Sequence, residues 1–309
     1  MRINRQQKTA AAWALAGVAA AAVLARYAPV APRRRKPARG LHIDTSRAFN
    51  RSSALLACSV LTDSAMEHYR GSFSNPAMYI PPVVATFSLL AGLHGGADRH
   101  AQTHTVRHAI YWGAALTGVA GTGFHIYNVM KRPGGWSWQN LFYAAPLGAP
   151  AALLLSGALG AAAERLRNQP AQSPRLLGMP AGKALGLLSG IGLAGTAAEA
   201  ALLHFRGSFQ HKAMYAPVSV PPAASALLLH ASLGKPQPRW LARVVLQLTW
   251  LIGWLGAAFH IRGVARHHGG WRNWSQNIYN GPPLPAPPSF AALALAGLAA
   301  LRLRESERR

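Results

Sequence analysis

The hydrophobic pattern of the chain is a series of long apolar runs separated by short polar segments. Each run holds about 20 residues, the length that an α-helix needs to cross the hydrocarbon core of a bilayer. The glycines and prolines within the runs are tolerated by membrane helices. The runs lie at residues 9–30, 52–70, 77–96, 108–129, 141–163, 183–205, 213–233, 241–262 and 284–302. This pattern predicts an all-α polytopic membrane protein with about nine transmembrane helices.

The overall composition indicates the same class of protein. Hydrophobic residues make up 50% of the chain and charged residues only 13%, which leaves too little polar surface to cover a soluble core. The single cysteine, Cys58, lies within an apolar run. It cannot form an internal disulfide, a Cys-ligated iron–sulfur cluster or a Cys-x-x-Cys-His haem attachment site. We therefore interpret Cys58 as a packing residue.

Positive charge is distributed unevenly between the connections. The formal net charge is +24, and twenty of the 32 lysines and arginines fall on one of two alternating faces, against eight on the other. The richer face comprises residues 31–51, 97–107, 165–183, 235–243 and the C-terminus. This excess predicts a multi-pass protein of the bacterial inner membrane, with that face and the C-terminus in the cytoplasm. The basic loops suit anionic lipid headgroups and not nucleic acid, because no stripe of alternating basic and aromatic residues is present.

The N-terminal segment allows two interpretations. The sequence "MRINRQQKTAAAWALAGVAAAAVLA" has the basic start, apolar middle and small-residue end of a signal peptide. Cleavage would place "RRRKPAR" outside and invert the remaining helices, which contradicts the distribution of charge. We therefore favour an uncleaved signal-anchor helix with its N-terminus outside, followed by a basic loop, over residues 1–51.

Three sequence motifs occur twice in the chain. The stretch "HYRGSFSNPAMYIP" (68–81) returns as "HFRGSFQHKAMYAP" (204–217), with nine of fourteen positions identical. "GTGFHIYNVMKRPGGW" returns as "GAAFHIRGVARHHGGW", and "QNLFYAAPLGAP" returns as "QNIYNGPPLPAP". Repetition of this kind indicates a duplicated structural unit.

The spacing of these motifs places four apolar runs in each unit. Because four is an even number, both copies enter and leave on the same side of the membrane, as parallel repeats do. We therefore predict two parallel four-helix repeats, at 52–167 and 184–309, joined by a cytoplasmic linker at 168–183.

Four histidines occupy matched positions in the two units. His68 and His204 close the first helix of each unit, and His125 and His260 close the third. Both helices run outward, so we expect all four near the non-cytoplasmic face. Imidazoles from two facing helices can ligate b-type haem without cysteine, and copper or non-haem iron also accepts imidazole. These histidines are candidate haem or metal ligands; a structural hydrogen bond between helices is the alternative.

Two acidic residues lie inside apolar runs at matched positions. Asp63 and Glu199 each precede a repeated histidine by five residues. A carboxylate at the bilayer centre costs about 2.5–3.5 kcal/mol on insertion scales, so two matched ones suggest proton handling or ligand binding. We take Asp63 and Glu199 as the candidate catalytic residues. A hydrogen bond that ties two helices together is the alternative interpretation.

A quinone site would use the same region of the protein. Such a site needs a histidine or tyrosine that donates to a quinone oxygen, an acid that relays protons, and aromatic walls. The remaining candidate cofactor-binding residues are matched pairs near this face: Arg70 and Arg206, Tyr79 and Tyr215, and Trp136 and Trp271. The arginines can snorkel to the interface, and the tryptophans also suit the interfacial belt of a membrane protein.

These features together favour a redox function. We expect an integral membrane subunit that interacts with quinone, with b-type haem as the other candidate cofactor. It would exchange electrons with a periplasmic or membrane partner protein, because the chain has no soluble domain for a flavin or nicotinamide. In architecture alone, two four-helix units resemble the quinone-reacting membrane subunits of some bacterial respiratory complexes. The alternatives are a proton-coupled transporter, which parallel repeats and intramembrane acids also suit, and a structural or assembly protein.

Overall fold

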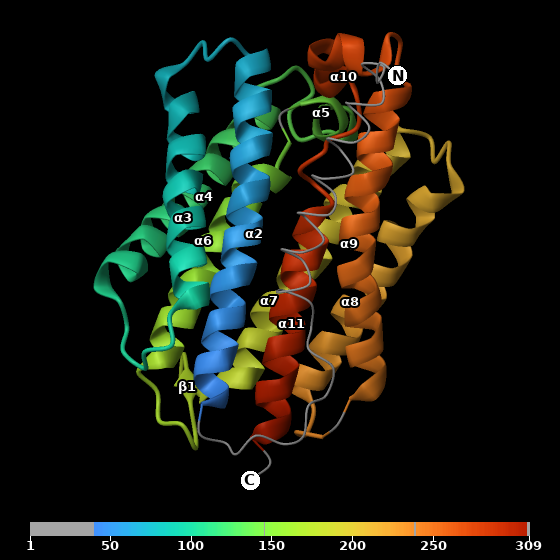
Figure 1. The fold of residues 1–309 in the computed structure, drawn as a ribbon. Helices are drawn as coiled ribbons and strands as arrows, with labels where there is room; N and C mark the ends of the chain where they lie inside the picture. Colours follow the sequence, from blue (N-terminus) through green and yellow to red (C-terminus); the bar gives the residue numbers. More distant parts are fainter. Residues whose placement is uncertain (1–39, 145, 238, 308–309) are drawn as a thin grey trace, which may run out of the picture. The chain divides into compact units, whose positions relative to one another are not determined.

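The computed structural model describes residues 40–144, 146–237 and 239–307. Regular structure in this part of the chain is helical apart from one hairpin of two short antiparallel strands, β1 (Arg175–Leu176) and β2 (Met179–Pro180) (Figure 1). The prediction of a helical chain is confirmed to that extent. The apolar run at 9–30 lies outside the described residues.

The helices follow one another in the same order before and after the hairpin. Before it come α2 (Leu41–Arg70), α3 (Ile80–Ala97), α4 (Thr105–Met130), α5 (Trp138–Tyr143) and α6 (Gly148–Arg167). After it come α7 (Ala181–Arg206), α8 (Ala216–Leu233), α9 (Trp240–Arg266), α10 (Trp274–Asn280) and α11 (Pro288–Ser306). Short 3₁₀ turns precede three of them: η1 (Pro76–Tyr79), η2 (Lys212–Tyr215) and η3 (Gly270–Asn273). We call residues 40–167 the first half and residues 181–307 the second half.

Four helical segments in the described part of the chain are long and apolar enough to cross a membrane: Pro76–Ala97, Ala181–Arg206, Lys212–Leu233 and Trp240–Arg266. One face of α9 shows what such a segment presents to its surroundings. Its apolar residues are between 41% and 49% exposed at Leu241, Val244, Leu248, Leu251 and Leu255. A continuous apolar face of this kind suits lipid better than water. The apolar helices therefore support the prediction of a membrane protein.

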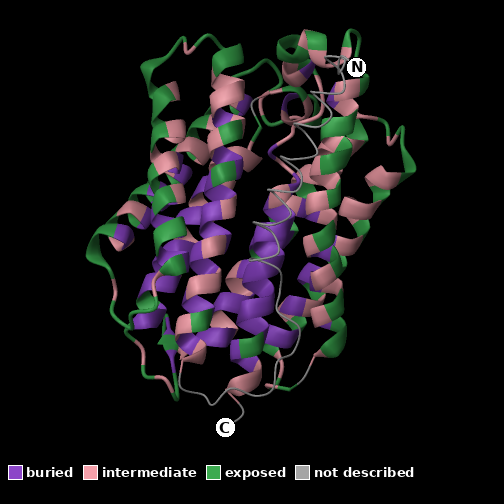
Figure 2. Cartoon of the chain, viewed as in Figure 1, coloured by how far each residue is buried: buried purple, intermediate pink, exposed green. Residues whose placement is uncertain are grey.

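The long helix α2 carries polar side chains, and the structure turns them inward. α2 packs against α3, α6 and α11, and Figure 2 shows buried positions gathered where these helices face one another. Ser46 Oγ and Ser53 Oγ donate hydrogen bonds to carbonyl oxygens of α6, at Ala163 (2.9 Å) and Ser156 (2.8 Å). Hydrogen bonds of this kind join membrane helices, because lipid chains have no group to which a polar side chain could bond. These polar side chains of α2 therefore make their contacts inside the protein.

Glycine allows two pairs of helices to approach closely. A Cβ atom at Gly118 of α4 would lie 2.3 Å from the backbone nitrogen of Leu154 in α6. One at Gly253 of α9 would lie 2.7 Å from the backbone nitrogen of Ala291 in α11. Small residues at such contacts are typical of membrane helix pairs. α4 with α6, and α9 with α11, are therefore packed in the same way.

Proline interrupts the apolar run at 141–163, which the pattern predicted as one span. α5 ends at Tyr143 and α6 begins at Gly148, with Pro146 between them. Proline has no N–H for the helical ladder and disfavours helix in the residue before it. In the second half, a proline-rich segment at 282–288 likewise separates α10 from α11. The corresponding part of each half is a short helix, a break and a long helix.

Candidate functional site

The first repeated motif forms a tight corner between α2 and α3. The Nδ1 atom of His68 lies 2.5 Å from the carbonyl oxygen of Met78. The backbone N–H of Phe73 donates to the carbonyl of His68 at 2.9 Å. Ser72 and Phe73 have left-handed φ angles of 55° and 46°, so the chain reverses directly after the helix. His68 therefore holds both sides of the reversal.

The second copy of the motif forms the same corner between α7 and α8. The Nδ1 atom of His204 lies 3.0 Å from the carbonyl oxygen of Met214. The N–H of Phe209 donates to the His204 carbonyl at 3.1 Å, and the φ angles of Ser208 and Phe209 are 54° and 46°. The two corners thus agree bond for bond.

The other residues that both copies of this motif share also pack against one another inside the corner. Phe73 stacks on Tyr79 with ring centroids 4.3 Å apart, and Phe209 stacks on Tyr215 at 4.7 Å. A Cβ atom at Gly71 would lie 2.8 Å from the Cε atom of the corner methionine, so glycine makes room for that side chain. Local packing therefore accounts for the repetition of Gly, Phe, Met and Tyr.

The second and third motifs meet where α4 turns toward α6 and where α9 turns toward α11. The Nδ1 atom of His125 lies 2.5 Å from the carbonyl oxygen of Pro146, and that of His260 lies 2.7 Å from the carbonyl oxygen of Pro283. The histidine near the end of α4 and the one near the end of α9 are thus each bonded to the proline break that follows. We call the end of the protein that holds these four histidine contacts the motif end.

An asparagine braces the glycine turn of each half at the motif end. Asn140 Nδ2 donates to the carbonyl of Gly135 at 2.8 Å, and Asn277 Nδ2 donates to the carbonyl of Gly270 at 2.9 Å. Both glycines have left-handed φ angles, 56° and 52°, which glycine adopts without steric cost. The repeated Gly-Gly-Trp and Gln-Asn pieces therefore form one structural unit.

All four repeated histidines use Nδ1 in the same way. A carbonyl oxygen only accepts hydrogen bonds, so Nδ1 carries the proton and donates it in each case. The neutral ring is left with an unprotonated Nε2, the atom with which it can ligate a metal or accept a proton. Metal-ligating histidines commonly donate their other ring N–H to a backbone carbonyl in this manner.

Within each half, the two repeated histidines are near enough to influence each other electrostatically. His125 lies within electrostatic range of His68, and His260 lies within range of His204. Among the described residues, no group of three or more His, Cys, Asp or Glu side chains could hold a metal ion. Each half therefore offers two imidazoles, the number that axial ligation of a b-type haem uses.

Asp63 of the first half and Glu199 of the second are near enough to interact electrostatically. Asp63 lies within electrostatic range of Glu199 and of Glu67 on its own helix. The Glu199 carboxylate accepts a hydrogen bond from the N–H of Gly148, at the start of α6, where the helix dipole favours negative charge. The Asp63 carboxylate has no hydrogen-bond partner in the described part of the chain. Glu199 thus has a structural partner, whereas Asp63 is available to take a proton.

The repeated arginines reach from each corner to a short helix of the other half. Arg206 lies over the ring of Tyr143 in α5, 5.5 Å from its centroid. Arg70 pairs with Glu67 at 2.5 Å and lies over the ring of Tyr279 in α10 at 5.8 Å. A guanidinium group is attracted to the face of an aromatic ring. These contacts tie the corners of the two halves together.

The aromatic candidates lie at the surface of the motif end. Tyr79, Tyr215 and Trp136 are each 55% exposed, and Trp271 is half-buried. The tyrosine rings belong to the two corner stacks, and Trp136 follows the braced glycine turn. Their exposure is typical of aromatic residues in the interfacial belt of a membrane protein.

A buried ion network lies at the opposite end of the first half, and sequence reasoning missed it. Arg107 of α4 donates two hydrogen bonds to Glu164 of α6, at 3.0 and 2.9 Å. Arg167 lies 3.3 Å from Glu164, and Asp98 lies 2.8 Å from Arg107. The side chains of Arg107, Glu164 and Arg167 are at most 2% exposed. The available signal was the position of these charges at the very ends of two apolar runs.

Asp98, in the connection between α3 and α4, completes this network. Burial alone would raise its pKa. Hydrogen bonds from His100 and Arg107, together with the charge of Arg167, outweigh burial and hold the pKa of Asp98 below its ordinary value. Two cations therefore face two anions, and a balanced network of this kind joins elements together. We call this end, with connections 98–104, 168–180 and 234–239, the basic end.

Comparisons with known proteins give no match to any protein-family model, curated protein or solved structure. The groups at the motif end that can bind a cofactor or carry a proton are the Nε2 atoms of the four histidines, two in each half, and the carboxylates of Asp63 and Glu199.

Proposed function

We propose that this protein is an integral membrane redox subunit in which the histidine pair of each half ligates a b-type haem. Electrons would pass between a quinone and a partner protein on the periplasmic side. The observation that carries the proposal is the common hydrogen-bond pattern of His68, His125, His204 and His260. Each ring directs Nδ1 to a backbone carbonyl and keeps Nε2 unprotonated. The hydrogen bond that His68 makes in its corner does not need a second histidine near the end of α4. The presence of His125 there therefore supports a shared ligand.

At a histidine that ligates no haem, a quinol would meet the same neutral imidazole. A neutral imidazole with its proton on Nδ1 has none to donate from Nε2, so it accepts a hydrogen bond from a quinol hydroxyl. The donor role that the sequence suggested for histidine is thereby reversed. Oxidation of the quinol releases two electrons to the redox chain and two protons. The carboxylate of Asp63, and the Nε2 atom of a histidine that ligates no haem, are the groups that suit these protons.

The proposal includes the architecture that the repeated motifs predict. We infer two parallel four-helix repeats, at 52–167 and 184–309, with a linker at 168–183 and a ninth transmembrane helix within 1–51. The matched corners and the matched glycine contacts support this duplication. Among the described residues, lysines and arginines are more numerous toward the basic end than at the motif end, which favours a cytoplasmic location for the basic end and for the C-terminus in a bacterial inner membrane.

The visible spectrum of the purified protein, oxidised and then reduced with dithionite, tests this proposal. We expect the Soret and α bands of a b-type haem. His68→Asn distinguishes a ligand from a corner residue, because an asparagine amide places a donor where Nδ1 stood and puts nothing in place of Nε2. This variant should stay folded and lose absorbance. His100→Asn, at a side chain that is 91% exposed, is the matched control and should keep the full spectrum.

The outcomes separate the two candidate cofactors. A colourless protein that binds a quinone analogue, and loses this with His68→Asn, would retain the redox function with quinone alone. A colourless protein that is indifferent to quinone would overturn the proposal.

A proton-coupled transporter is the second candidate, because Asp63 of one half lies within electrostatic range of Glu199 of the other. Transport sites commonly lie at the interface between repeats, and an unpartnered carboxylate there can carry a proton. Proteoliposome uptake that is lost with Asp63→Asn, but kept with His68→Asn, would select this function. If all of these variants change only stability, the protein has a structural or assembly role.

A further inference from the structure

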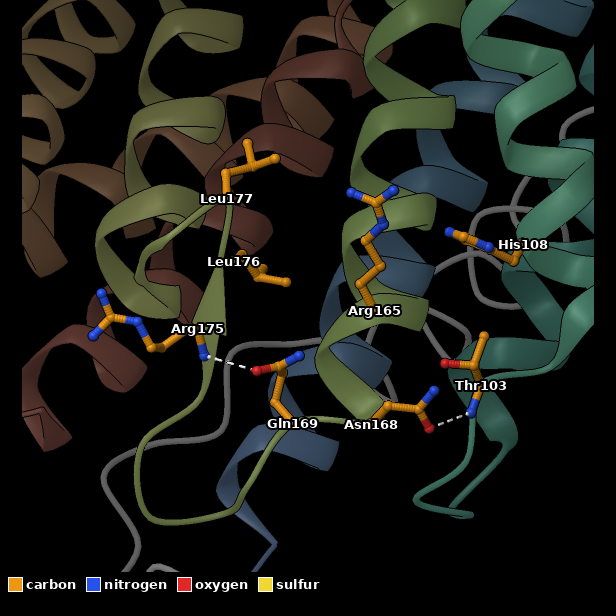
Figure 3. A pocket seen from close by; sticks show the side chains of 8 residues that line it. All are labelled: Thr103, His108, Arg165, Asn168, Gln169, Arg175, Leu176 and Leu177. Atoms are coloured by element: carbon orange, nitrogen blue, oxygen red, sulfur yellow. Dashed lines mark hydrogen bonds between the residues drawn. The ribbon is translucent and has the colours of Figure 1, made fainter.

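A pocket of about 460 Å³ opens at the basic end of the first half. It lies between the start of α4, the end of α6 and the β1–β2 hairpin (Figure 3). The residues that line it are Thr103, His108, Arg165, Asn168, Gln169, Arg175, Leu176 and Leu177, and none of these is acidic. We propose that this pocket binds the phosphate group of an anionic phospholipid from the adjacent membrane leaflet.

Arg165 is the cation that this site offers to an anion. It is exposed near the end of α6, and its guanidinium lies 5.4 Å from the centroid of the Trp112 ring. Among the described residues it has no carboxylate or carbonyl partner. Arg175 differs, because its guanidinium donates to the carbonyl of Gly178 and is turned away from Arg165 (Figure 3). A free guanidinium beside an aromatic ring at a membrane surface suits a phosphate group.

Three neutral polar side chains of the pocket, His108, Asn168 and Gln169, keep a donor for a ligand, whereas the hydroxyl of Thr103 donates to the carbonyl of Glu164 at 2.8 Å. His108 Nε2 accepts a hydrogen bond from Trp112 Nε1 at 3.2 Å, so the neutral ring carries its proton on Nδ1. Asn168 Oδ1 accepts from the N–H of Thr103 at 3.0 Å, and Gln169 Oε1 accepts from the N–H of Arg175 at 3.2 Å. With their oxygen atoms engaged, both amides have their NH₂ groups left for an acceptor. Phosphate oxygens are acceptors of this kind.

The apolar surroundings favour a lipid over free phosphate. Trp112, Leu116 and Val119 are 43%, 63% and 54% exposed, and their spacing puts them on one face of α4. This face leads from the pocket toward the middle of the helix, where acyl chains lie if α4 spans the bilayer. Leu177, at the tip of the hairpin, is 79% exposed. A cationic pocket that continues into an apolar face fits a headgroup and its attached chains.

The equivalent place in the second half already contains an anion. The repeated motifs align His108 with Arg243 and Asn168 with Glu305. Arg243 and Glu305 form an ion pair at 2.6 Å. The second half thus supplies its own carboxylate where the first half has an uncharged amide. Because of this difference, the proposed lipid phosphate binds at the first half and not at the equivalent place in the second.

Native mass spectrometry of the detergent-purified protein, loaded with phosphatidylglycerol or phosphatidylcholine, tests the site. We expect the wild type to retain phosphatidylglycerol preferentially. Arg165→Gln should weaken this retention about tenfold, the loss of one charge-assisted contact. Asn168→Glu, which introduces the carboxylate found in the second half, should weaken it similarly. Arg99→Gln, an exposed arginine of the same end, is the matched control and should retain lipid like the wild type.

Three results would overturn the proposal. Equal loss with Arg99→Gln would mean that the basic end attracts lipid only through its general charge. Equal retention of both lipids by the wild type would exclude a phosphate-selective site for anionic lipid. Displacement of phosphatidylglycerol by inorganic phosphate, with binding of that phosphate, would show that the pocket takes free phosphate and not a lipid.

Discussion

The motif end and the basic end of the protein are held together by different kinds of contact. At the motif end, side chains bond to main-chain carbonyls, and His204 repeats the contact of His68. At the basic end, the first half buries the ion network around Glu164, whereas the second half has two separate pairs, the partly exposed Arg243–Glu305 and the more buried Arg304–Glu307. The histidine contacts of one end are therefore the same in both halves, whereas the ion pairs of the other end are not.

This difference shows which parts of a duplicated sequence can stay alike. A side chain bonded to a backbone carbonyl needs no particular partner residue, so each copy can rebuild the contact independently. An ion network needs several side chains that change together, and the two halves have diverged there. Repetition of histidine therefore does not by itself indicate function, because Nδ1 has a structural role. Only the unused Nε2 atoms are evidence for a ligand.

The largest expected effect is at the buried network. Glu164→Gln leaves Arg107 and Arg167 with too little negative charge, and breaking a buried pair typically costs about 3–5 kcal/mol. We expect a loss of this size in the free energy of unfolding, measured by titration with SDS in mixed micelles.

The second half provides the matched control for this prediction. Glu305→Gln breaks an ion pair whose side chains are 32% and 20% exposed, so its cost should be at most about 1 kcal/mol. Equal losses from Glu164→Gln and Glu305→Gln would contradict the difference between the two halves at the basic end.

A smaller and equal effect is expected from the asparagines that brace the glycine turns. Asn140→Ala and Asn277→Ala each leave turn carbonyls without their donor, which costs about 1–3 kcal/mol. The same unfolding titration should give losses that agree within about 0.5 kcal/mol, the usual error of additivity. Clearly unequal losses would contradict the equivalence of the two halves at the motif end.

The last expected effect is the pH dependence that Asp98 gives to stability, because its stabilising contribution is present at neutral pH and is lost only in acid. Its pKa in the folded state is below the ordinary value, so its stabilising contacts are fully present above about pH 4, the unfolded pKa. They are lost progressively as the pH falls below that value toward the folded pKa. Unfolding titrations between pH 3 and 7 should show a steeper acid loss for the wild type than for Asp98→Asn. Parallel curves would mean that Asp98 is not paired in the folded protein.

Much of the helical arrangement could be predicted from the sequence, because apolar runs of membrane length have few alternatives. The reversals after Arg70 and Arg206 could be predicted from the glycine that follows each. The pairing of Arg107 with Glu164 could not, because it depends on how α4 and α6 are aligned along their lengths. The approach of Asp63 to Glu199 depends on packing between the halves. The proton position on each histidine depends on a carbonyl across the turn, which sequence spacing does not reveal.

The most direct test of the central claim is the haem content of the purified protein, measured as the pyridine haemochromogen. If each half binds one haem through its own pair, His68→Asn and His204→Asn should each remove half of the haem. The double variant should remove all of it while remaining folded. Haem-free wild-type protein, or a haem content that neither asparagine variant changes, would contradict the account.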